Sequence, residues 1–152
     1  MALAAGLRRV AALRDRPEGD RPGQRPQVSF QVERRGDRVL GLAQGIDRAH
    51  LDRLSRGETP VDLELDLHGL SAADARRLVR ETLRCAHEDG DRCVLIIHGR
   101  GKHSELSPVL REGLVEWLQE PPTSRLVMAF ASARPGDGGV GASYVLLRRR
   151  RS

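Results

Sequence analysis

Two polar residues close a short apolar strand pattern in LELDLHGL, residues 63–70. Asp66 and His68 are two positions apart, so on a strand their side chains lie on the same face. A carboxylate beside an imidazole can orient the ring and stabilise its charge during proton transfer, or the two groups can hold a metal ion. The alternative is structural: Asp66 continues the polar face of Asp62 and Glu64, and His68 caps the following helix.

A second group of polar residues follows the apolar run CVLII, in the loop IIHGRGKHS. Its members are His98, Gly99, Arg100, Gly101, Lys102 and His103. Glycine amides that approach an anion, together with fixed cations, are typical of a phosphate-binding loop. A Gly-x-Gly pattern alone is weak, and an ordinary glycine turn with solvated basic residues is the alternative. Two strand ends that bring histidines, an acid and cations to one edge favour a composite site.

These residues suit the cleavage of phosphodiester bonds. In RNA the 2′-hydroxyl attacks its own phosphate when a base removes its proton and an acid protonates the leaving oxygen. His68 and either His98 or His103 are candidates for those two roles. Hydrolysis of DNA lacks this internal nucleophile and calls for a metal-activated water, for which Asp66 is the available acid. We therefore favour RNA and metal-independent cleavage, leave a divalent metal open as the alternative, and identify no other cofactor.

The elements that position these residues follow the order β-α-β-α-β-β. Hydrophobic spacing predicts strands at 61–67, 93–97, 125–131 and 143–149 and helices at 71–90 and 107–121. This order predicts a two-layer α/β sandwich in which helices cover one face of a small mixed sheet. Because βαβ crossovers are right-handed, the first two strands should be parallel and their following loops should open side by side.

The N-terminal part of the chain is poor in signals of order. Residues 14–27 are rich in Pro, Gly and charge, so we expect residues 1–44 to be an extension and linker, largely disordered, with a short amphipathic helix near its start. Residues 45–60 should hold a lead-in helix that Asp47 caps. Residues 61–150 should form the folded domain.

Composition favours a nucleic-acid partner. The chain has 152 residues, a formal net charge of +5, a pI near 10.4 and only 3% aromatic residues, so phosphate contacts should outweigh base stacking. The tail RRRR, residues 148–151, is either solvated or adds salt-dependent affinity. Cys85 and Cys93 lack the spacing of a zinc or redox site. No apolar run approaches the roughly 20 residues of a membrane span, so we expect a cytoplasmic protein without a membrane partner.

Three motifs in order, LDLHGL, IIHGRGKHS and GGVGASYVLLRR, resemble the small MutS-related (Smr) domain in its standalone bacterial SmrA/SmrB form. The likeness covers residues 45–150. It implies a nuclease domain in which Asp66 and His68 are catalytic and His98, Gly99 and Gly101 form the His-Gly-x-Gly loop. His103 stands where many relatives have a third glycine, which favours the translation-linked branch.

The resemblance implies an endonuclease that acts on RNA, such as mRNA on stalled ribosomes. A DNA-nicking enzyme and a non-catalytic module that binds nucleic acid or the ribosome are the alternatives.

Overall fold

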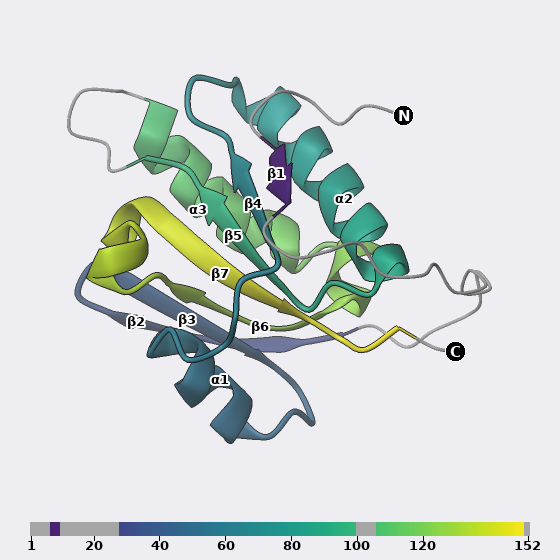
Figure 1. Ribbon diagram of the computed structural model, residues 1–152. Coiled ribbons are helices and arrows are strands. Elements are labelled where there is room, and N and C mark those ends of the chain that lie inside the picture. The colour runs from purple at the N-terminus through teal and green to yellow at the C-terminus, as the bar shows by residue number, and fades with distance from the viewer. Residues whose placement is uncertain (1–6, 10–27, 100–105, 151–152) are drawn as a thin grey trace.

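The computed structural model describes residues 7–9, 28–99 and 106–150 of the chain (Figure 1). Its strands are β1 (Leu7–Arg9), β2 (Phe30–Arg35), β3 (Arg38–Ala43), β4 (Leu63–Asp66), β5 (Cys93–Ile97), β6 (Val127–Ser132) and β7 (Ala142–Leu147). Its helices are α1 (Arg48–Ser55), α2 (Ala72–Asp89) and α3 (Leu106–Leu118), with short 3-10 turns η1 (Thr123–Arg125), η2 (Pro135–Asp137) and η3 (Gly139–Gly141).

All the described strands join one mixed sheet in the order β1-β4-β5-β7-β6-β3-β2. Strands β4 and β5 are parallel, whereas each other neighbouring pair is antiparallel. The order β4-α2-β5-α3-β6-β7 therefore confirms the predicted βαβαββ arrangement, including its parallel first pair. Strand β5 lies in the interior of the sheet, as its continuous apolar sequence indicates.

Helices α2 and α3 pack on one face of the sheet, and α1 packs on the opposite face (Figure 1). Leu63 and Leu65 of β4 point into the larger core beneath α2 and α3. Leu51 and Leu54 of α1 are buried in a second core with Tyr144 of β7. The predicted two-layer sandwich is thus present, and α1 adds a partial layer on the other face.

Local sequence signals explain where helix α2 begins and ends. The Ser71 hydroxyl accepts a hydrogen bond from the Asp74 backbone N–H at 3.1 Å, which satisfies one free donor of the first turn. Gly90 follows the helix in the left-handed conformation, with φ of 87°, which glycine adopts without steric cost. Ala75, Leu78 and Val79 repeat at helical spacing and are buried against the sheet.

The prediction of a linker through residues 28–44 is wrong. Strands β2 and β3 form a hairpin around Gly36 and Asp37, and β3 pairs with β6. Burial of the Val39 and Leu40 side chains stabilises the hairpin. The charged residues of β2 do not show the alternation that would have predicted this strand.

The described part of the N-terminal segment also differs from the expectation of a short helix. Residues Leu7–Arg9 form strand β1, which pairs antiparallel with β4. Without β1, the outer edge of β4 would have unpaired backbone N–H and C=O groups. Pairing with this edge favours an extended conformation of residues Leu7–Arg9. The other residues of this segment lie outside the described part of the chain. None of the described helices is long and apolar enough to cross a membrane.

Candidate active site

The ends of β4 and β5 lie side by side at one edge of the sheet. Asp66 is in register with Ile97, and the Leu67 N–H donates a hydrogen bond to the Ile97 carbonyl at 2.7 Å. His68 and His98 therefore both follow strand ends at the same edge. The expectation that these two loops start side by side is confirmed at their first residues.

Asp66 and His68 contact each other directly. Asp66 Oδ1 lies 3.0 Å from His68 Nδ1 and accepts a second hydrogen bond, also of 3.0 Å, from the His68 backbone N–H. A carboxylate at Nδ1 favours the tautomer that carries its proton there and leaves Nε2 as an acceptor. The His68 side chain is 74% exposed and that of Asp66 is 36% exposed. The pair is thus both preoriented and accessible to a large substrate.

His98 has a different environment. Its imidazole is buried, with 0% of the residue exposed, and Nε2 lies 3.0 Å from the Ser143 hydroxyl. Burial lowers the pKa of His98 to about 4, and the Arg111 cation adds to this effect. At neutral pH the ring is uncharged and out of contact with solvent. The geometry therefore does not support the predicted role of His98 in proton transfer.

The backbone around His98 fixes the start of the predicted phosphate-binding loop. The N–H groups of His98 and Gly99 both donate to the Gly141 carbonyl, each at 2.9 Å. Gly99 has φ of 92°, a left-handed conformation that favours glycine at this bend. The other predicted phosphate-binding residues, Arg100, Gly101, Lys102 and His103, lie outside the described part of the chain.

Side-chain hydrogen bonds between the η2 turn and β7 support this edge. Tyr144 donates a hydrogen bond to the Asp137 carboxylate, which also accepts one from Arg134 Nε at 3.2 Å. These bonds tie the glycine-rich connection to β7, whose residue Ser143 contacts His98. The sequence predicted a glycine loop here but carried no signal for Ser143, because its partner is 45 residues away.

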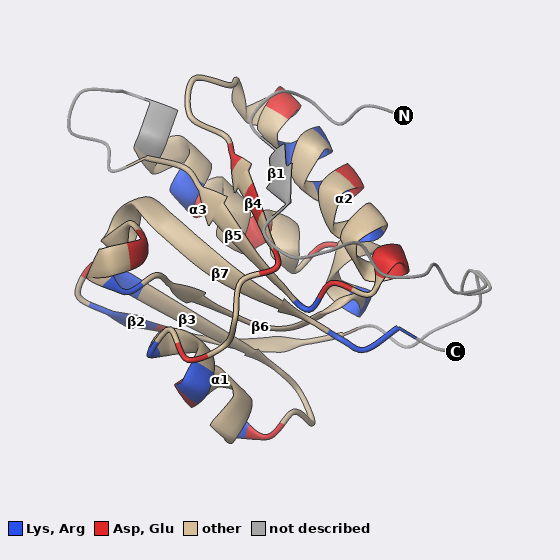
Figure 2. Ribbon diagram, viewed as in Figure 1, with Lys and Arg blue, Asp and Glu red and all other residues tan. Residues whose placement is uncertain are grey.

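Charge is unevenly distributed over the structure. Acidic residues lie along β4 and just before it, whereas basic residues gather where the chain leaves β7 (Figure 2). In the described part of the chain, no three His, Cys, Asp or Glu side chains are close enough to hold a metal ion together. Asp66 and His68 would thus be two protein ligands at most among the described residues, and both already contact each other.

Residues 65–148 match the model of the Smr domain family, which is more than half of the chain. The chain belongs to the Smr family. The matched region of this Smr chain begins inside β4 and includes Asp66, His68 and the His98 loop.

Named Smr relatives fall into two groups. A probable DNA endonuclease SmrA of Escherichia coli K12 is 35% identical over 107 residues, which cover 70% of this chain and 56% of the relative. A ribosome rescue factor SmrB of Yersinia enterocolitica is 32% identical over 103 residues, which cover 68% of this chain and 54% of the relative. The Smr chain therefore spans about half the length of the curated relatives it matches.

A solved structure shows the same architecture. YdaL, a stand-alone small MutS-related protein from Escherichia coli, superposes with a TM-score of 0.59 at 32% identity. The match covers 80% of this chain and 85% of YdaL. The predicted Smr-like fold is confirmed.

Proposed function

We propose that this Smr chain is an endonuclease that cleaves phosphodiester bonds, with RNA as its favoured substrate. The exposed Asp66–His68 pair at the end of β4 carries this proposal. The contact of His68 Nδ1 with Asp66 leaves His68 Nε2 to exchange a proton with a substrate, while the Asp66 carboxylate stabilises the imidazolium that forms. The name of the SmrA relative, a probable endonuclease, supports this reaction class.

In RNA the reaction would use the 2′-hydroxyl as nucleophile. His68 Nε2 takes its proton, the 2′-oxygen bonds to phosphorus, and the bond from phosphorus to the 5′-oxygen breaks. The departing oxygen needs a proton from a second group. Because His98 is buried and uncharged at neutral pH, we assign this role to His103. The products are a 2′,3′-cyclic phosphate and a 5′-hydroxyl.

We assign the rest of the His98 loop to substrate binding. Arg100 and Lys102, with the amides of Gly99 and Gly101, would hold the phosphate and stabilise charge on its non-bridging oxygens. His98 would act as a positioning residue, since its contacts with Ser143 and Gly141 fix where the loop begins.

The relatives' names suggest two substrates. The SmrB name, ribosome rescue factor, supports mRNA on stalled ribosomes, which would place this chain in the cytoplasm with the ribosome as a partner. The SmrA name supports DNA nicking as the second candidate function. That reaction would require a water nucleophile, and a divalent metal with Asp66 among its ligands would be the means to activate it.

The test compares labelled RNA and DNA of one sequence, each incubated with the purified chain in the presence of magnesium or of a chelator. The parent should cut RNA both with magnesium and with the chelator, and the Asp66→Ala/His68→Ala variant should cut RNA under neither condition. Analysis of the RNA ends should find a cyclic phosphate. An Asp37→Ala variant, which removes an exposed carboxylate from the β2–β3 turn, serves as the control and should cut at the parent rate.

Each other result has a definite meaning. Cleavage of DNA alone, and only with magnesium, would replace the RNA mechanism with the DNA-nicking one. RNA binding without any cleavage would show that the chain is a non-catalytic module that binds nucleic acid. Equal cleavage by the parent and the double variant would show that Asp66 and His68 are only a solvated strand face.

A further inference from the structure

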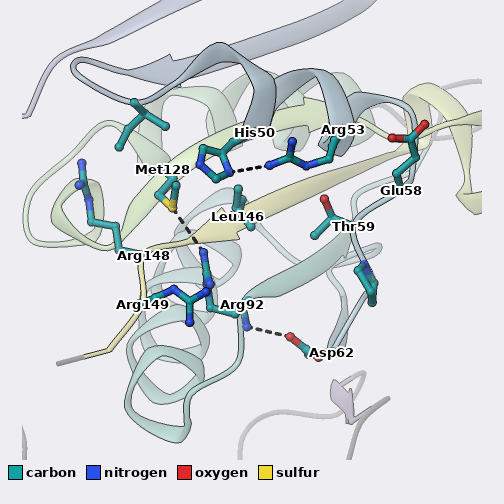
Figure 3. Close-up of a pocket in the computed structure, with 12 residues that line it drawn as sticks. His50, Arg53, Glu58, Thr59, Asp62, Arg92, Met128, Leu146, Arg148 and Arg149 are labelled. Carbon is teal, nitrogen blue, oxygen red and sulfur yellow. Dashed lines mark hydrogen bonds between the residues drawn. The ribbon is translucent and has the colours of Figure 1, made fainter. Parts of the chain in front are cut away.

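A second basic site lies at the opposite end of β4 from His68. A pocket of about 680 Å³ opens between α1, the start of β5 and the end of β7 (Figure 3). Its charged lining comprises Arg53, Arg92, Arg148 and Arg149 together with Glu58 and Asp62. Four arginines from three separate parts of the chain thus surround one hollow.

The two acids of this pocket have partners that reduce their effect on a ligand. Glu58 accepts a hydrogen bond from Arg56, which is not part of the lining, at 3.0 Å. Asp62 is buried and accepts the backbone N–H groups of Arg92 and Cys93 at 2.8 and 3.2 Å. The field inside the pocket is therefore set by the arginines and favours anions.

The arginines differ in how they are held. Arg92 Nε donates to the Leu147 carbonyl at 2.9 Å, which fixes its position at the pocket wall. Arg53 donates to His50 Nδ1 at 3.1 Å, as Figure 3 shows. Within the described part of the chain, no ion pair or side-chain hydrogen bond engages Arg148 or Arg149. Guanidinium groups match the geometry of phosphate oxygens, so these two can bind a phosphate without first losing a partner.

We infer that this pocket is a second binding site for the phosphates of a nucleic acid strand, which it holds at a set distance from the Asp66–His68 pair. This inference rests on the proposed function, because it takes the bound strand to be the substrate. Asp62 lines the pocket and Asp66 belongs to the active site. Four residue steps of extended chain separate them, about 13 Å. At the rise of a duplex strand, about 3.4 Å per nucleotide, this distance corresponds to about four nucleotides, and an extended single strand would span it with no more than that number.

The surface between the two sites supports contact at its ends and not along its middle. Glu64 lies between Asp62 and Asp66 on the same face, so the residues of β4 between the two sites offer a phosphate no arginine. A strand should therefore make its phosphate contacts at the pocket and at the active site. A substrate that ends before it reaches the pocket should lose affinity without losing the reacting groups.

The test measures binding of a fluorescent single-stranded RNA of about 20 nucleotides, longer than the roughly 4–16 nucleotides of a typical single-strand site. The Asp66→Ala/His68→Ala background keeps the RNA intact. In that background, Arg148→Ala/Arg149→Ala should weaken binding and lower the slope of log affinity against log salt by about two. A DNA probe of the same sequence tests whether the phosphates alone are recognised.

The control removes the same charge from another face. Arg76→Ala/Arg77→Ala acts on α2, across the sheet, where the two arginines pair with Glu120 and Asp74. This variant should keep the parent slope. An RNA of about 2 nucleotides cannot reach both sites at once, because roughly four nucleotides separate them. The pocket substitution should therefore change its affinity less than that of the long RNA.

The inference is overturned if the pocket variant binds the long RNA with parent affinity and salt slope, as it would if the pocket served an acidic protein instead. An equal loss in the α2 control also overturns it, since net charge alone would then explain the effect. If the chain cuts no substrate yet the pocket variant alone loses RNA binding, the nuclease proposal fails and the pocket stands.

Discussion

A carboxylate that contacts both the ring and the backbone of the same histidine leaves that ring one orientation. Asp66 does this for His68, and its negative charge would stabilise the imidazolium formed when His68 takes a proton. We expect Asp66→Asn to lower the rate constant for RNA cleavage about 100-fold or more while leaving RNA affinity near the parent value. Single-turnover cleavage at saturating enzyme measures the rate, with Asp37→Asn as the control. A loss of affinity with an unchanged rate would instead make Asp66 a binding residue.

Burial of His98 predicts a pH-dependent stability. Its folded pKa of about 4 lies below the ordinary value of 6.5, so the unfolded chain binds this proton first. The free energy of unfolding should therefore fall as the pH drops from about 6.5 to 4, by about 3 kcal/mol from this group, and level off below. Urea unfolding of the parent and of His98→Asn across this range measures the difference.

In the His98→Asn variant the fall between about pH 6.5 and 4 should be smaller, although the variant is less stable at pH 7 because it loses packing. Other groups titrate equally in both chains and cancel in the comparison. An identical pH profile for the two proteins would show that the imidazole is not buried in solution.

At the scale of elements, the β2–β3 hairpin packs through a glycine. A methyl group on Gly41 would lie 2.2 Å from the ring of Phe130, which is buried in the core and contacts Phe30. We expect Gly41→Ala to lower the free energy of unfolding by about 1–3 kcal/mol, because the buried ring would have to shift to admit the methyl group. Gly136→Ala is the matched control, since a methyl group there meets no atom within 4 Å. Equal unfolding midpoints for the two variants would contradict this packing.

The elements that the sequence predicts are those whose periodicity and caps agree. Helix α2 carries Ser71, Gly90 and a regular apolar face, and β5 is continuously apolar, so both were predicted. The hairpin was missed because Glu33, Arg34 and Arg35 interrupt the alternation of β2, although Gly36 and Asp37 are residues typical of a two-residue turn.

The candidate site was predictable only in its local parts. Asp66 and His68 are neighbours in sequence, so their contact follows from strand geometry. The burial of His98 depends on tertiary contacts with Ser143 and the Gly141 carbonyl, more than 40 residues away, which no local pattern encodes.

For the whole molecule, the folded unit begins earlier than Gly45. Val39, Leu40 and Ala43 are buried, and Phe30 and Val32 pack against the larger core. A chain that starts at Gly45 should lose its cooperative thermal transition, because each buried apolar side chain contributes about 1.5–3 kcal/mol to a total of about 5–15 kcal/mol. A chain that starts at residue 28 should keep that transition. Circular dichroism melts measure both, and a cooperative melt of the shorter chain would contradict the assignment.

The pairing of β3 with β6 also sets when this protein can complete its fold during synthesis. Leu40 is opposite Ala131, about 90 residues later in the chain. Translation at about 5–20 residues per second leaves the hairpin without its sheet partner for roughly 5–18 seconds. During that interval the hairpin edge that β6 will cover is open to other extended chains, while the charges of Glu33, Arg34 and Arg35 discourage pairing on the β2 side. The nascent chain thus exposes the unpaired edge of β3, which can bind other extended chains, until its last third emerges from the ribosome.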